Sequence, residues 1–153
     1  HLAGAGRQGG VAGGAFVGRV SMELNTMEPK AVVEAYWQEM QSNDFAKAAS
    51  WLGDDFFCDW PQSGERIVGR ENFIEINRRY PAAGLWRFEI VRLLAQGSEV
   101  VSEVLVSDGV VNARAITFHH VAEGKIQQQT EYWPDEYAAP EWRSSWVCPM
   151  PKS

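Results

Sequence analysis

The sequence predicts an α+β domain in which helices pack on one face of a curved antiparallel sheet. Three observations support this class: apolar residues with helical spacing come first, strand-like segments follow, and short glycine turns join those strands. Because helices that cover a long, curved sheet leave a conical space, we expect three N-terminal helices on the concave face. The resulting cone-shaped pocket would be either filled by aromatic side chains or open to a ligand.

Two helices are expected first, beginning at Pro29, a residue that suits a first helical turn. The apolar stripe of the first helix has helical spacing and consists of Val32, Val33, Tyr36, Trp37 and Met40. The sequence SNDF ends this helix and starts a short second one, with an apolar face of Phe45, Ala48, Ala49 and Leu52.

The strands are expected after these helices. The segment DDFFCDW, closed by Pro61, predicts a strand, and QSGERIVG predicts a loop before a third helix at residues 70–80. Further strands are expected at residues 85–94, 99–107, 110–121 and 125–133. The turns between them include Asp108-Gly109, and Asp-Gly between apolar runs is a strong hairpin signal.

Charge, hydropathy and cysteine spacing limit the classes of partner and cofactor that we expect. The chain has 153 residues, enough for one domain, and a net charge of -6, which disfavours binding to nucleic acid or to an anionic membrane. No apolar run is long enough to span a membrane, and no signal-peptide pattern is present, so we expect a cytoplasmic protein. Cys58 and Cys148 form no CxxC motif, and no metal or cofactor is expected.

The two ends differ from the domain predicted at residues 27–138. Residues 1–26 predict a Gly-rich flexible extension; its Gly4-x-Gly6-x-x-Gly9 run matches a dinucleotide motif, but no strand can precede it. Residues 139–153 form an aromatic tail, and we expect Trp142 and Trp146 to dock on the domain or on a dimer partner.

The order of these elements, with YWQEMQSNDFAKAASWLGDDFFCDWP at the front and GKIQQQTEYWPD at the end, resembles the nuclear-transport-factor-two-like superfamily. The polyketide-cyclase-like branch is the most similar, and the resemblance covers residues 29–137. It implies a curved sheet, a cone-shaped pocket and a homodimer formed through the sheet. The superfamily includes ketosteroid isomerases, scytalone dehydratase, limonene-epoxide hydrolases, polyketide cyclases and binding proteins without catalysis.

The resemblance to ketosteroid isomerases implies that Tyr36 stands where an oxyanion donor is found. The position of the isomerase base is Trp60, and Asp59 is one residue earlier. Adjacent strand residues face opposite ways, so Asp59 is not a simple replacement. The second oxyanion acid falls near Ile116, so this chain lacks it.

The resemblance to epoxide hydrolases implies three catalytic acids: Glu131 on the last strand, Glu103 on a middle strand and Asp59 at an asparagine position. The tyrosine position is Phe57, and the linking arginine position is Val101. If Glu103 and Glu131 face each other, one of them should have a raised pKa. One carboxyl could then act as base on a water and the other as acid on a leaving oxygen.

Strand alternation leaves alternatives open for these residues. Glu131 shares a face with Gln127, Gln129 and Trp133, and that face is either a solvated surface or the inside of the cone. His119 and His120 point to opposite faces and cannot bind one metal together, but one of them could enter the pocket. Arg114 is expected to point outward. The expected substrate-binding residues are Tyr36, Trp37, Trp60, Trp86, Phe88, His119, Gln129 and Trp133.

Two functions follow for such a pocket, and both take a small apolar molecule as partner. The first is cofactor-free acid/base catalysis: hydration, dehydration, isomerisation or cyclisation. The second is a ligand-binding or dimerisation protein without catalysis. The two differ in whether Glu131, Glu103 and Asp59 converge on one cavity, because catalysis by paired acids requires at least two of them there.

Overall fold

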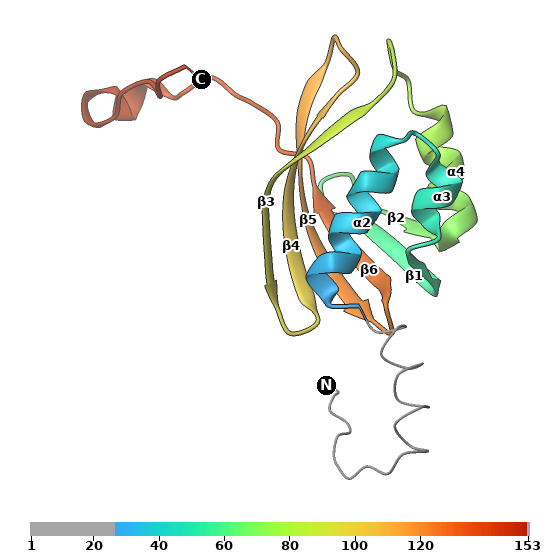
Figure 1. Cartoon of the computed structure of the whole chain (residues 1–153). Helices are drawn as coiled ribbons and strands as arrows, with labels where there is room; N and C mark the ends of the chain where they lie inside the picture. The colour runs from blue at the N-terminus through green and yellow to red at the C-terminus, as the bar shows by residue number, and fades with distance from the viewer. Residues whose placement is uncertain (1–26, 153) are drawn as a thin grey trace, which may run out of the picture.

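A computed structural model describes residues 27–152, and the predicted α+β class is confirmed: helices cover one face of a curved six-stranded sheet (Figure 1). The expected glycine-rich extension at residues 1–26 lies outside the described residues. No helix within the described range is long and apolar enough to cross a membrane.

The helices follow the apolar stripes of the sequence. They are α2 (Pro29–Gln41), α3 (Phe45–Ala49), α4 (Gly69–Arg79) and a short 3-10 helix, η1 (Glu141–Trp146). All five residues of the predicted first stripe are buried in α2. Asp44 begins α3 as its N-cap, because its side chain accepts the backbone N–H of Lys47 at 3.1 Å.

The sheet has the order β2-β1-β6-β5-β4-β3. Its strands are β1 (Leu52–Trp60), β2 (Glu65–Val68), β3 (Arg87–Gln96), β4 (Glu99–Ser107), β5 (Asn112–Ala122) and β6 (Lys125–Tyr132). The prediction of an antiparallel sheet needs one correction, since β1 pairs with β6 in parallel. The predicted loop after Pro61 also contains β2, which pairs with β1 across the turn at Gly64.

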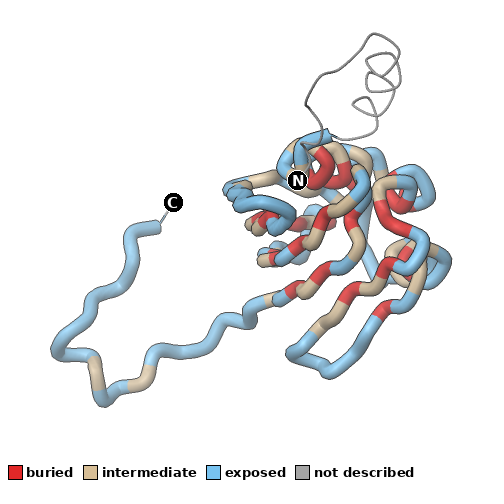
Figure 2. The backbone as a smooth tube through the Cα atoms, turned by 90° about the horizontal axis from the view of Figure 1, so that it is seen from below, coloured by how far each residue is buried: buried red, intermediate tan, exposed pale blue. Residues whose placement is uncertain are grey.

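The core lies between the helices and the concave face of the sheet. Helix α2 contacts β3 to β6, and α4 contacts β1 and β2. Buried and less buried residues alternate along the strands (Figure 2). In β4, for example, Val100, Ser102, Val104 and Val106 are buried towards the helices, so the residues between them face outward.

The C-terminal tail is mostly exposed. After β6 the chain leaves the sheet, and η1 stands apart from the rest of the molecule (Figures 1 and 2). Trp142 and Trp146 are 74% and 79% exposed. Both indoles are therefore largely free of contact with their own domain, and their docking on the domain or on a dimer partner stays a prediction.

Candidate functional site

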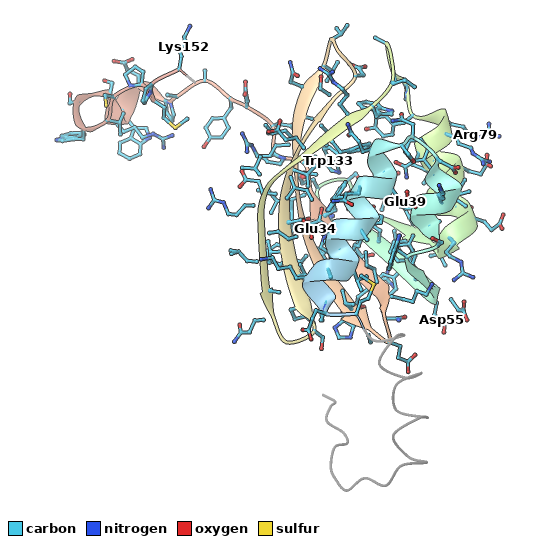
Figure 3. The ribbon with its side chains drawn as sticks, in the orientation of Figure 1. Glu34, Glu39, Asp55, Arg79, Trp133 and Lys152 are labelled. Carbon is cyan, nitrogen blue, oxygen red and sulfur yellow. The ribbon has the colours of Figure 1, made fainter. Side chains whose placement is uncertain are left out.

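A pocket of about 160 Å³ lies between the helices and the concave face of the sheet. Its lining is mostly apolar and contains eight aromatic side chains: Tyr36, Trp37, Trp60, Phe73, Tyr80, Trp86, Phe88 and Trp133. The polar side chains of the lining, apart from the tyrosines and tryptophans, are Asn77, Gln129 and Glu131. Charged residues such as Glu34 and Arg79 are exposed on the outside of the helices (Figure 3).

Glu131 provides the carboxylate of this pocket. It lies on β6 and is only 7% exposed. Its Oε1 accepts the indole N–H groups of Trp60 at 3.0 Å and Trp133 at 3.2 Å. Its Oε2 accepts the hydroxyl of Thr117, the facing residue on β5, at 2.7 Å. Three neutral donors from three parts of the chain therefore fix the orientation of one buried carboxyl group.

Burial raises the pKa of Glu131 above its ordinary value, although the hydrogen bonds from Trp60, Thr117 and Trp133 each act to lower it. A carboxylate has about four acceptor positions on its two oxygens. Two are used on Oε1 and one on Oε2. The position that remains lies on Oε2, where a proton or a ligand donor can bind.

Tyr36 lies on α2, is 2% exposed and lines the same pocket. Burial raises the pKa of its hydroxyl, and the negative charge of Glu131 raises it further, while a hydrogen bond with Gln129 lowers it. The hydroxyl therefore keeps its proton at neutral pH and can act as a donor to a ligand.

His119, one of the expected substrate-binding residues, does not line the pocket. The side chain is fully buried on β5, with Nε2 2.8 Å from Ser102 Oγ and Nδ1 3.2 Å from Gln129 Nε2. Ser102 also accepts the indole N–H of Trp37 at 3.1 Å. Burial lowers the pKa of His119 to about 3, so the ring is neutral. It contacts Gln129 directly and Trp37 through Ser102, and both Gln129 and Trp37 line the pocket.

Glu103 lies on the outer face of the sheet, away from the pocket. It alternates with the buried Ser102 and Val104 on β4, so its side chain points to the opposite side. Its carboxylate pairs with Arg92 at 3.1 Å and with Arg114. The structure does not bring Glu103 to Glu131, and Arg114 points outward as expected.

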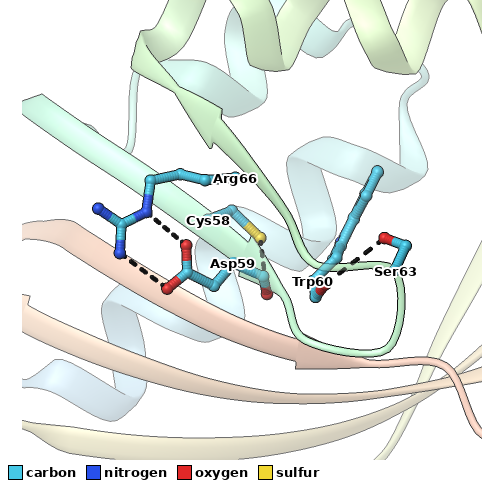
Figure 4. Close-up of polar contacts among 5 residues, drawn as sticks. All are labelled: Cys58, Asp59, Trp60, Ser63 and Arg66. Carbon is cyan, nitrogen blue, oxygen red and sulfur yellow. Dashed lines mark hydrogen bonds and ion pairs between the residues drawn. The ribbon is translucent and has the colours of Figure 1, made fainter.

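Asp59 also lies outside the pocket. Its two oxygens accept the guanidinium of Arg66 on β2 at 2.6 Å and 3.0 Å (Figure 4). This pairing lowers the pKa of the Asp59 carboxyl. Its neighbours Cys58 and Trp60 point to the other face and line the pocket. Of the three predicted acids, only Glu131 therefore reaches the cavity.

The other predicted binding residues all line the pocket: Tyr36, Trp37, Trp60, Trp86, Phe88, Gln129 and Trp133. Ten further residues that were not predicted from the sequence also line the pocket: Met40, Cys58, Ile67, Phe73, Ile76, Asn77, Tyr80, Val106, Val111 and Ala113. The stripe of α4 was a usable signal, since Phe73, Ile76, Asn77 and Tyr80 share one helix face. Within the described range, no three His, Cys, Asp or Glu side chains are grouped to hold a metal ion.

Comparison with known proteins identifies similar domains. A family model described as a SnoaL-like domain matches residues 33–129. A structure from Kribbella flavida DSM 17836, provisionally described as a ketosteroid isomerase, is 28% identical, with a TM-score of 0.74 over 81% of this chain and 90% of that one. An NTF-2 like protein of unknown function from Burkholderia xenovorans LB400 is 33% identical, with a TM-score of 0.66 over 80% and 95%.

A more distant structure, an LEH-like epoxide hydrolase from M. tuberculosis, is 24% identical, with a TM-score of 0.58 over 70% of this chain and 83% of that one. At this identity, the likeness shows the fold alone. A search of curated proteins found no match.

Proposed function

The chain belongs to the SnoaL-like domain family, within the NTF2-like superfamily, and we propose that it binds a small, largely apolar molecule in its aromatic pocket. Glu131 is the polar anchor of this site. The observation that carries the proposal is the burial of this carboxylate in the wall of an apolar cavity, with one acceptor position on Oε2 left open. A buried carboxylate without a structural ion pair is costly, and ligand sites are where such groups are commonly found.

The size of the cavity limits the ligand. Pockets for drug-sized molecules start at ~300 Å³, whereas this one holds about 160 Å³. We therefore expect a compact ligand, or one compact group of a longer ligand that extends through the mouth of the pocket.

Tryptophan fluorescence tests this proposal, because four of the seven tryptophans line the pocket. The chain is titrated with small cyclic ketones, epoxides, terpenoid alcohols and amines. We expect at least one class to change the emission in a saturable way. The change should disappear in Ala113→Phe, which places a ring inside the cavity, and persist in Ala122→Phe, at the end of β5 outside the lining. Saturable binding that survives Ala113→Phe would contradict the proposal.

A second candidate function is proton transfer by a single base. It is favoured by Tyr36 and Glu131, which line one pocket closely enough for the charge of Glu131 to raise the pKa of Tyr36. The Glu131 carboxylate would remove a proton from a carbon beside a carbonyl and return it at another carbon, while Tyr36 donates to the enolate oxygen. Catalysis by two acids is not proposed, because Glu103 and Asp59 lie outside the cavity.

Proton exchange tests this second function directly. Small cyclic ketones are incubated with the chain in D₂O, and loss of their α-hydrogen signals is followed by NMR. Enzymatic exchange that is lost in Glu131→Gln and kept in Glu103→Gln supports proton transfer. Exchange at the buffer rate with every ketone that binds would leave ligand binding as the function.

We also propose a homodimer formed through the outer face of the sheet. Phe118 and Tyr132 are 48% and 37% exposed there, and their rings contact each other edge to face. Leu94, on the neighbouring part of this face, is 60% exposed. A second copy would cover these side chains by an isologous contact. Light scattering should give the mass of a dimer for the wild type and of a monomer for Phe118→Asp; a wild-type monomer at high concentration would contradict this.

A further inference from the structure

We infer that the group held in this pocket is a small alkylated ammonium cation, bound beside Glu131 and among aromatic rings. This inference rests on the proposed binding function and names the chemical class of its ligand. Three features carry it: the charge of the lining, the unpaired state of Glu131 and the number of aromatic rings.

The lining has one sign of charge. Among residues 27–152, the side chains that form the pocket include the carboxylate of Glu131 but no Lys, Arg or His. Tyr36 and Cys58 line it too, and burial raises the pKa of both above its ordinary value, so both are neutral. An anionic ligand would be repelled by Glu131 with nothing to compensate it, whereas a cation would be attracted.

Glu131 lacks a charged partner in the described part of the chain. Glu103 and Asp59 each pair with arginine, but the contacts of Glu131 are two indole N–H groups and one hydroxyl. A buried carboxylate is stabilised most by an opposite charge. A cation next to the free position on Oε2 would provide that charge and would act against the burial that raises the pKa of Glu131.

The donors around Glu131 favour a cation over a neutral ligand. To donate a hydrogen bond to a carbonyl, Glu131 must be protonated, the form that burial favours. The three donors that point at its oxygens act against burial and stabilise the charged form, which is the form that a cation needs. A cationic ligand binds the charged carboxylate, so these three donors can stay in place when it binds.

The aromatic rings provide the rest of the site. Eight aromatic residues line the cavity, and Trp60 and Trp133 are held beside Glu131 by their own N–H groups. The faces of such rings attract cations, most strongly in tryptophan and in dry sites. Alkylated ammonium groups suit such a cage because their methyl groups also match an apolar wall.

Two compounds of the same shape, one cationic and one neutral, test the inference. Choline carries a trimethylammonium group, and 3,3-dimethylbutan-1-ol has a carbon atom in place of that nitrogen. Their affinities are compared by tryptophan fluorescence and calorimetry for the wild type, for Glu131→Gln and for Glu103→Gln. The last is the matched control, because the same substitution is made on the outer face. Thermal melts verify that each variant is folded.

We expect the wild type and Glu103→Gln to bind choline about tenfold or more tightly than the alcohol, a difference of about 1.4 kcal/mol or more. Glu131→Gln should lose this preference.

Equal or tighter binding of the alcohol by the wild type would overturn the inference about charge and leave the binding function intact. An unchanged preference in Glu131→Gln would also overturn it. If neither compound nor any member of the apolar panel binds, the binding function itself is contradicted. If Glu131→Gln does not fold, the wild-type comparison alone decides.

Discussion

Trp60 and Glu131 lie 71 residues apart in the chain, yet the indole nitrogen of Trp60 is 3.0 Å from Oε1 of Glu131. The contact is possible because β1 and β6 are parallel neighbours, so the ends of both strands reach the same edge of the sheet. Trp60 is therefore more than part of the apolar wall: it is a donor that orients the carboxyl group and opposes the rise in its pKa.

Trp60→Phe should raise the pKa of Glu131 further. The substitution keeps an aromatic ring but removes one of the three donors that stabilise the carboxylate. The pKa can be followed by ¹³C NMR of chain labelled at its glutamate carboxyl groups. Trp86→Phe is the control, since Trp86 lines the pocket but is not among the donors to Glu131. A fall in the pKa of Glu131 in Trp60→Phe would contradict this interpretation.

Glu131→Gln should change how stability depends on pH. The pKa of Glu131 is raised on folding above its ordinary value of 4.5, so the folded state holds this proton more tightly than the unfolded state. The stabilisation from that proton is present below pH 4.5 and is lost as the pH rises through the folded pKa. Urea denaturation should therefore show the stability of the variant, relative to the wild type, increasing over this interval. A difference that does not vary with pH would show that the pKa is not raised.

His119 should make stability depend on pH in the opposite direction to Glu131. Its pKa falls on folding from 6.5 to about 3, so the stability that it contributes is present above pH 6.5 and is lost as the pH falls toward 3. His119→Gln, which can keep a hydrogen bond but cannot be charged, should reduce this loss by ~3 kcal/mol between pH 7 and pH 4. Denaturation between pH 7 and pH 4 measures it, with His120→Gln on the outer face as the control. Equal acid sensitivity of the wild type and His119→Gln would rule out a neutral, buried imidazole.

The C-terminal tail should contribute little to the stability of its own domain. Trp142 and Trp146 are mostly exposed, so deleting residues 140–153 removes few buried contacts. The melting temperature at low protein concentration should stay within about 2 °C of the wild type. A larger decrease that grows with protein concentration would locate the tail on a second copy, and a decrease independent of concentration would mean that it packs on its own domain.

Local sequence patterns were sufficient to predict most of the elements. The stripe of α2 is buried as expected, and β4 has the predicted limits, because both depend on side-chain spacing and glycine turns. The parallel pairing of β1 with β6 depends on contacts between distant segments, and no local pattern reports it. The short strand β2 was missed for a similar reason, since its four residues pair only with β1.

The face of the sheet to which each acidic side chain points was harder to predict. Around Glu103, the residues of both faces of β4 are mostly apolar, because the outer face of this sheet carries apolar side chains as well. Alternation alone therefore could not assign Glu103 to one face. For Asp59, the ion pair depends on β2, which places Arg66 directly opposite Asp59 on β1. The place of Glu131 followed from the resemblance of its strand to a known family, since its neighbours fit either face.

The affinity of a ligand from the apolar panel for Glu131→Gln and for Glu103→Gln tests the central claim most directly. If Glu131 is the polar anchor of the site, its substitution should change the affinity by about tenfold or more, while Glu103→Gln should bind as the wild type does. Equal affinities in all three chains, or a change in Glu103→Gln alone, would contradict the assignment of Glu131 as the polar anchor of this site.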